Sequence, residues 1–172
     1  MHIQHARAQD GAQIEILLDA AFGTDRKART AYRLRQGLMP VSALSFIARD
    51  AKGRLIGSIQ CWPLTLRDGH TNHALTLLGP VAVAPDLQRS GLGKQLMAAA
   101  LRVADAQGLD ALMLIGDVEY YGKFGFSAHA TADWQVPGPV DRHRLLARTT
   151  GGRTLPAMGE LHPGNAAQTL AA

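Results

Sequence analysis

Residues 77–94 constrain the fold of this 172-residue chain most strongly, because they read as a strand, a glycine-bearing turn and a helix in succession. The apolar strand pattern ends at Pro85, and Gly91 and Gly93 lie where the helix pattern begins. A helix N-terminus exposes unpaired backbone N–H groups, which together with the helix dipole favour an anion such as a phosphate. Glycines allow a ligand to approach the backbone closely, and Arg89 and Lys94 add positive charge. The segment therefore predicts a phosphate-binding loop between a strand and a helix.

Two common phosphate loops do not fit these residues. A Walker loop requires Ser or Thr after Gly-Lys, and here Gln95 follows Lys94. A dinucleotide-binding loop requires three glycines, and this turn has two. What remains is Gln-x-x-Gly-x-Gly, starting at Gln88, directly after a Val-x-Val strand. This pattern resembles the acetyl-CoA pyrophosphate loop of the GNAT N-acetyltransferases.

A second signature follows the predicted helix. The strand pattern of residues 111–115 leads into Gly116, and Tyr121 then stands four residues before Gly125-Phe126. GNAT enzymes carry a tyrosine at the same spacing from a Gly-Phe pair, and residues 116–126 are similar to the YhbS-like branch of that family. The resemblance implies an α/β (α+β) GNAT fold, with a mixed central sheet of about six to seven strands, the fourth and fifth splayed, and helices on both faces.

The resemblance also implies an activity and a set of site residues. We expect acetyl transfer from acetyl-CoA to a primary amine of a small molecule or peptide in a ternary complex, without a metal. Tyr121 would protonate the CoA thiolate, since a tyrosine is protonated at neutral pH. A backbone N–H of Val81 or Val83 would stabilise the tetrahedral intermediate. The residues expected to bind the cosubstrate are Val81, Ala82, Val83, Gln88, Arg89, Ser90, Gly91, Leu92, Gly93, Lys94, Tyr121 and Phe124.

The general base stays open, because residues 71–83 contain no Asp or Glu. Asp117, Glu119 or a chain of waters could take the amine proton, and either carboxylate could instead cap the following helix. Leu114 stands where many relatives have an asparagine that contacts pantetheine. Two other functions remain as alternatives: a catalytically weak acyl-CoA-binding sensor and a basic nucleic-acid-associated protein. The intact Tyr121 favours the enzyme.

Periodicity predicts the remaining elements of a single domain over residues 1–172. After a short strand near residues 3–6, Asp10 and Gln13 form a capping-box-like pair for a helix ending at Gly23. Gly79-Pro80 predicts a bulge or an opened ladder in the fourth strand. We also expect a helix over 25–36, strands over 44–49, 55–66, 71–83 and 144–149, a helix from the loop to Gly108, and a poorly specified tail from about residue 150.

Charge and cysteine content limit the partners and the compartment. Two basic clusters, residues 26–35 and 142–148, contribute to the net charge of +4. We interpret both as solvated faces because no RNA-binding motif adjoins them. Cys61 is interpreted as a small buried hydrophobe. Trp134 and residues 137–139 are placed beside the acceptor pocket by the resemblance, although a core position suits Trp134 equally. A single cysteine and no apolar leader favour the cytoplasm, with no membrane partner and a homodimer left open.

Overall fold

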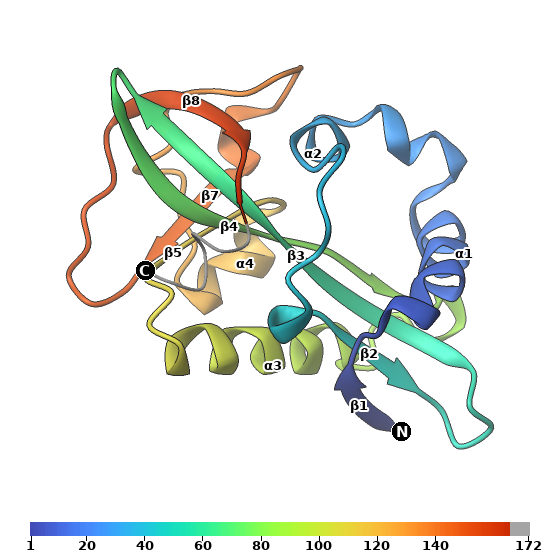
Figure 1. Ribbon diagram of the computed structural model, residues 1–172. Helices are drawn as coiled ribbons and strands as arrows, with labels where there is room; N and C mark the ends of the chain where they lie inside the picture. The colour runs from blue at the N-terminus through green and yellow to red at the C-terminus, as the bar shows by residue number, and fades with distance from the viewer. Residues whose placement is uncertain (166–172) are drawn as a thin grey trace.

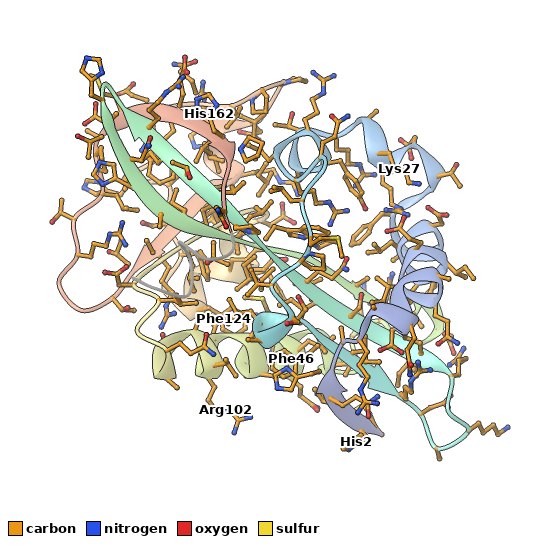
Figure 2. The ribbon with its side chains drawn as sticks, viewed as in Figure 1. His2, Lys27, Phe46, Arg102, Phe124 and His162 are labelled. Atoms are coloured by element: carbon orange, nitrogen blue, oxygen red, sulfur yellow. The ribbon has the colours of Figure 1, made fainter. Side chains whose placement is uncertain are left out.

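The computed structural model describes residues 1–165, and within them one mixed sheet carries the fold (Figure 1). Six strands follow one another across this sheet: β1 (His2–His5), β2 (Phe46–Arg49), β3 (Leu55–Asp68), β4 (Thr71–Val83), β5 (Ala111–Ile115) and β7 (Leu145–Thr149). β8 (Met158–Pro163) pairs with the second half of β3 and with the short β6 (Asp133–Gln135). Only β4–β5 and β6–β8 are parallel pairs among these strands. In Figure 2, His162 on β8 lies in the upper part of the view and His2 on β1 lies at the bottom.

Four α-helices accompany the sheet in the described part of the chain: α1 (Gly11–Phe22), α2 (Thr30–Leu34), α3 (Leu92–Ala106) and α4 (Val118–Tyr121). In Figure 1, α3 runs across the lower left of the molecule, α1 lies at the right, and α2 lies near the top, between α1 and the β3–β4 hairpin. α3 buries one apolar stripe, as its spacing predicts. It packs so closely on β3 that a Cβ at Gly57 would lie 3.0 Å from side-chain atoms of Leu92 and Leu96.

The predicted irregularity at Gly79-Pro80 is confirmed as a bulge. Leu78 is opposite Cys61 and Val81 is opposite Ile59, so the register of β4 against β3 shifts at the Gly-Pro pair. β4 and β5 cover residues 71–83 and 111–115, as the sequence predicts, and β3 continues two residues beyond the predicted end, to Asp68.

β4 and β5 stay paired over a very short stretch. Their parallel ladder consists of Thr76 opposite Leu112 and Leu77 opposite Met113. Beyond Leu77 neither strand has the other as a ladder partner, although both continue. The expected separation of the fourth and fifth strands is therefore present, and it opens beside the bulge.

The single helix predicted over residues 25–36 is wrong. Residues Thr24–Ala28 form a 3₁₀ turn, Arg29 is extended (φ −71°, ψ 149°), and only Thr30–Leu34 is α-helical. Arg26 explains the break, because its fully buried guanidinium pairs with Asp19 at 2.7 Å and with Glu15 at 2.6 Å, both on α1. These tertiary contacts outweigh the helical propensity of a basic segment.

Two smaller predictions also need correction. The carboxylate of Asp10 does not cap α1; it accepts a hydrogen bond from the backbone N–H of Arg7 at 2.8 Å and pairs with Arg49 at 2.8 Å. The tail beyond residue 149 contains β8, which buries Leu161 and extends the sheet to eight strands, more than the number implied by the resemblance.

Candidate active site

Two pockets meet where β4 and β5 separate. The first, here named the cleft pocket, has a volume of about 520 Å³ and lies between residues 77–81 of β4, the end of β5 and residues 28–35. The second, here named the loop pocket, has a volume of about 480 Å³ and is lined by residues 87–94. Phe22, Val81 and Tyr121 line both pockets. The two pockets therefore adjoin each other at these three residues.

The loop pocket is built around the N-terminus of α3. All seven residues from 88 to 94 line it. Gly91, the residue preceding α3, has φ +84°, and Arg89 has φ +66°, so the backbone of the loop is held in left-handed conformations. A Cβ at Gly93 would lie 3.1 Å from the Tyr120 hydroxyl, which places Tyr120 over the first turn of the helix. The loop therefore presents a helix N-terminus to this pocket, an environment that favours an anion.

The end of β4 directs backbone N–H groups toward the gap. The N–H of Ala84 donates to the carbonyl of Ile56 on β3 at 2.9 Å. Because successive N–H groups alternate sides along a strand, those of Val83 and Val81 point away from β3, to the side from which β5 has separated. Both residues line the loop pocket. The bulge and the splay thus leave donors where a ligand in the gap can reach them.

Tyr121 lies at the junction of the two pockets. Its ring meets Tyr120 edge-on at 4.8 Å between centroids and Phe126 at 6.5 Å. Burial raises the pKa of Tyr121 to about 12, and the charges of Tyr120 and Asp117 add to the rise. The hydroxyl is therefore a neutral proton donor throughout the physiological range.

Gly116 positions the ring of Tyr121, a role that its sequence pattern alone did not indicate. A Cβ built on it would lie 2.2 Å from one ring carbon of Tyr121 and 2.7 Å from another. Only a glycine at this position leaves room for the tyrosine ring as it stands. A glycine directly after a strand, five residues before the tyrosine, is the one sequence signal that could have suggested this contact.

The structure brings most, but not all, of the expected binding residues together. Val81, Val83, Tyr121 and residues 88–94 line the loop pocket. Ala82 is 1% exposed, pairs with Ser58 on β3 and lines neither pocket. Phe124 also lies outside both linings and packs near Tyr120, with 6.0 Å between ring centroids.

The two candidate bases are placed differently. Asp117 lines the cleft pocket and forms an ion pair with Arg144 at 3.1 Å, while its backbone carbonyl accepts the N–H groups of Tyr120 and Tyr121. Glu119 is exposed and lines neither pocket. Leu114 is buried in the core on β5.

Two other candidates are core residues. Trp134 is fully buried, and its indole Nε1 donates to the carbonyl of Pro156 at 2.9 Å, so it does not line the cleft pocket; Pro139 does. Burial raises the pKa of the Cys61 thiol to about 12, which makes it an inert core residue.

The first basic cluster is only partly a solvated face. Arg26 is fully buried and Arg35 is 7% exposed, and both line the cleft pocket, whereas Arg33 is exposed. The interpretation of a wholly solvated cluster is therefore wrong. Nothing in the local sequence pattern of this basic segment indicates that Arg26 and Arg35 are buried and that Arg33 is exposed.

Residues 1–165 contain neither a helix that could span a membrane nor a cluster of side chains that could hold a metal ion. None of their helices combines the length and the apolar character needed to cross a membrane. They also contain no group of three or more His, Cys, Asp or Glu side chains arranged to hold a metal ion.

Comparison with known proteins identifies the class of this chain. Residues 11–126 match the model of the acetyltransferase (GNAT) family, which covers more than half of the sequence. The chain therefore belongs to the GNAT family and is an acyltransferase. It is 29% identical over 153 residues to the uncharacterized N-acetyltransferase YhbS of Escherichia coli (strain K12), with 84% of this chain and 87% of that protein covered. It is also 27% identical over 130 residues to the uncharacterized N-acetyltransferase YjhQ of the same strain, with 76% of this chain and 71% of that protein covered.

Solved structures show the same fold. The crystal structure of Escherichia coli YhbS in complex with CoA superposes with a TM-score of 0.74 at 22% identity, covering 97% of this chain and 91% of that one. A GNAT acetyltransferase from Brucella melitensis in complex with acetyl-CoA gives a TM-score of 0.68 at 26% identity, covering 96% of each chain.

Proposed function

We propose that this protein transfers the acetyl group of acetyl-CoA directly to a primary amine within a ternary complex, from a cytoplasmic location. The observation that carries the proposal is the position of Tyr121, which lines both the loop pocket and the cleft pocket. Two structural relatives were solved with CoA and with acetyl-CoA, which supports the same cosubstrate here. In this arrangement the pyrophosphate occupies the loop pocket and the amine enters through the cleft pocket.

The reaction needs a donor for the developing oxyanion and an acid for the leaving thiolate. The amine nitrogen attacks the thioester carbonyl carbon, and a backbone N–H of Val81 or Val83 donates to the oxygen as it becomes negative. As the C–S bond breaks, the Tyr121 hydroxyl gives its proton to the sulfur. Desolvation keeps this hydroxyl protonated until that step.

The amine must also lose a proton. Of the two carboxylates considered, Asp117 lines the cleft pocket and Glu119 does not. We infer that the proton leaves through Asp117 or through water beside it, with Arg144 holding the carboxylate in place at 3.1 Å. Tyr121 then recovers its proton from solvent through the same route, which closes the cycle.

An acetyl-CoA turnover screen tests the proposal. Amines, amino acids, aminoglycosides and peptides are each incubated with acetyl-CoA, and free thiol is measured as it is released. The proposal expects thiol release that depends on both the amine and the enzyme. Calorimetric binding of acetyl-CoA without turnover on any amine would instead favour the sensor, and binding of oligonucleotides but not acetyl-CoA would favour the nucleic-acid alternative.

A further inference from the structure

Arg35 is a buried cation that the transfer mechanism does not use. It follows α2 directly, is 7% exposed, and lines the cleft pocket but not the loop pocket. Its Nη1 atom is buried and has no hydrogen-bond partner within residues 1–165. An arginine is charged at neutral pH, and leaving a buried charged donor without a partner costs free energy. A ligand in this pocket can remove that cost.

The guanidinium is held in place by aromatic rings. Its Cζ lies 3.7 Å from the centroid of the Tyr32 ring and 4.8 Å from that of Trp62. Arg26 fixes Tyr32 from another direction, because its Nη1 donates to the Tyr32 hydroxyl. Stacking orients the planar fork of an arginine without satisfying its N–H donors. Arg35 is therefore preorganised for an acceptor in the plane of its fork.

The other cations around the cleft pocket already have partners. Arg26 pairs with Glu15 and Asp19, and Arg144 pairs with Asp117. Arg29 donates to the backbone carbonyl of Phe22 at 2.9 Å. Arg35 forms no ion pair with any residue that the structure describes. Arg29 is exposed, so Arg35 is the one buried cation in the lining of this pocket that has no ion pair with a described residue.

We propose that Arg35 binds a carboxylate of the acceptor, so that the substrate is a small amino acid or a closely related aminocarboxylate. This inference rests on the proposed acetyl transfer and adds the substrate class. The carboxylate would accept from the guanidinium of Arg35, and the amine would extend toward Tyr121, which lines the same pocket. A carboxylate is favoured over a phosphate monoester because Arg35 is the one buried cation of the lining without an ion pair, and its planar fork matches a carboxylate.

Matched pairs of amines test the assignment. Phenylalanine and phenethylamine, and lysine and cadaverine, differ only in the carboxylate, and kcat/KM is measured for each with saturating acetyl-CoA. The wild-type protein is expected to prefer the amino acid of each pair. Arg35→Gln should lower kcat/KM for the amino acids by about 10- to 100-fold, the usual scale for one charge-assisted hydrogen bond. The kcat/KM for the amines without a carboxylate should change little. Arg35→Lys should restore part of the loss, since it retains the charge but not the fork.

Two further variants separate this effect from damage to the fold. Arg35→Met replaces a buried unpaired charge with an apolar side chain of similar length, so it should fold at least as stably as the wild type while losing the carboxylate preference. Arg102→Gln is the matched control, because Arg102 projects from α3 into solvent, away from the sheet (Figure 2). Acetyl-CoA affinity, measured by calorimetry, should stay the same in all four variants.

The outcomes distinguish this inference from the proposed function. Equal use of both members of each pair, or equal losses on both in Arg35→Gln, would overturn the carboxylate assignment and leave acetyl transfer standing. Better use of phosphoethanolamine than of the amino acids would overturn it in favour of a phosphate. If no amine is acetylated, titration of each amino acid into the CoA-saturated protein decides. Binding that requires Arg35 supports the assignment, and no binding contradicts it.

Discussion

The ring of Tyr121 occupies the space that any side chain at position 116 would need. A Cβ on Gly116 would come within 2.2 Å of that ring, and the ring is confined by Tyr120 and Phe126. The hydroxyl position therefore depends on a residue that has no functional group of its own.

Gly116→Ala is expected to displace the Tyr121 ring and lower kcat by about 10- to 100-fold, because a misplacement of about 1 Å is enough to disrupt catalysis. The KM for acetyl-CoA should change little. Steady-state kinetics measure both, and Gly11→Ala is the matched control, since a Cβ at Gly11 meets nothing within 4 Å. Wild-type kcat in Gly116→Ala would show that the ring does not need this position.

The acidity of Tyr121 leads to a prediction about pH. Burial raises its pKa to about 12, so the hydroxyl stays protonated as the pH rises from 7 to 10. The acceptor amine, in contrast, loses its proton over this range and becomes nucleophilic. We expect kcat/KM to rise with pH up to about 10 without a descending limb. A descending limb between pH 7 and 10 that Tyr121→Phe lacks would contradict the raised pKa.

Among single residues, the sequence singled out the loop glycines and Tyr121 as candidate site residues. It did not indicate the contact of Gly116 with the Tyr121 ring or the burial of Arg35. The loop and Tyr121 are recognisable because each belongs to a spaced motif. Gly116 acts through a contact with a ring five residues away, and Arg35 through burial among Tyr32 and Trp62. Burial of a single arginine within a basic run depends on tertiary packing, which no local pattern records.

Among the elements, the strongly patterned ones were predicted well and the short ones were not. β4, β5 and α3 lie where periodicity places them, because each buries a continuous apolar stripe or run. The helix predicted over residues 25–36 breaks at Arg29 because Arg26 is drawn into contact with α1. β6 has three residues and β8 six, and strands this short carry little periodic signal.

The loop between β4 and α3 is expected to bind the pyrophosphate of acetyl-CoA through its backbone and its two cations. Gly93→Val should weaken acetyl-CoA binding by about 10-fold or more, because the valine side chain would clash with the Tyr120 hydroxyl and occupy part of the loop pocket. Gly91→Val should do the same by forcing the φ of +84° to change. Arg89→Ala and Lys94→Ala should weaken binding more at low salt than at high salt, since both act as charges.

Calorimetry at two salt concentrations measures these effects. Gly53→Val is the matched control for Gly91→Val, because Gly53 also has a positive φ with nothing near its Cβ but lies in the β2–β3 turn. Unchanged acetyl-CoA affinity in folded Gly91→Val and Gly93→Val would remove the loop from the binding site.

Across the whole molecule, segments far apart in the chain converge on one junction. The end of α1, the bulged half of β4 and the end of α4 contribute the residues shared by the two pockets, Phe22, Val81 and Tyr121. Of these, only Tyr121 has a side chain that can donate a proton. We therefore propose that the chemical step takes place at this one hydroxyl, with the acetyl donor in the loop pocket and the amine in the cleft pocket.

The role of the Tyr121 hydroxyl is tested by steady-state kinetics of Tyr121→Phe, with Tyr120→Phe measured beside it. We expect Tyr121→Phe to lower kcat by about 100-fold or more and to leave acetyl-CoA affinity nearly unchanged, because only the proton donor is lost. The hydroxyl of Tyr120 lies over Gly93 in the loop pocket, so its removal in Tyr120→Phe should have a smaller effect on kcat. Near-wild-type turnover by Tyr121→Phe, or a large loss confined to Tyr120→Phe, would show that Tyr121 is not the proton donor.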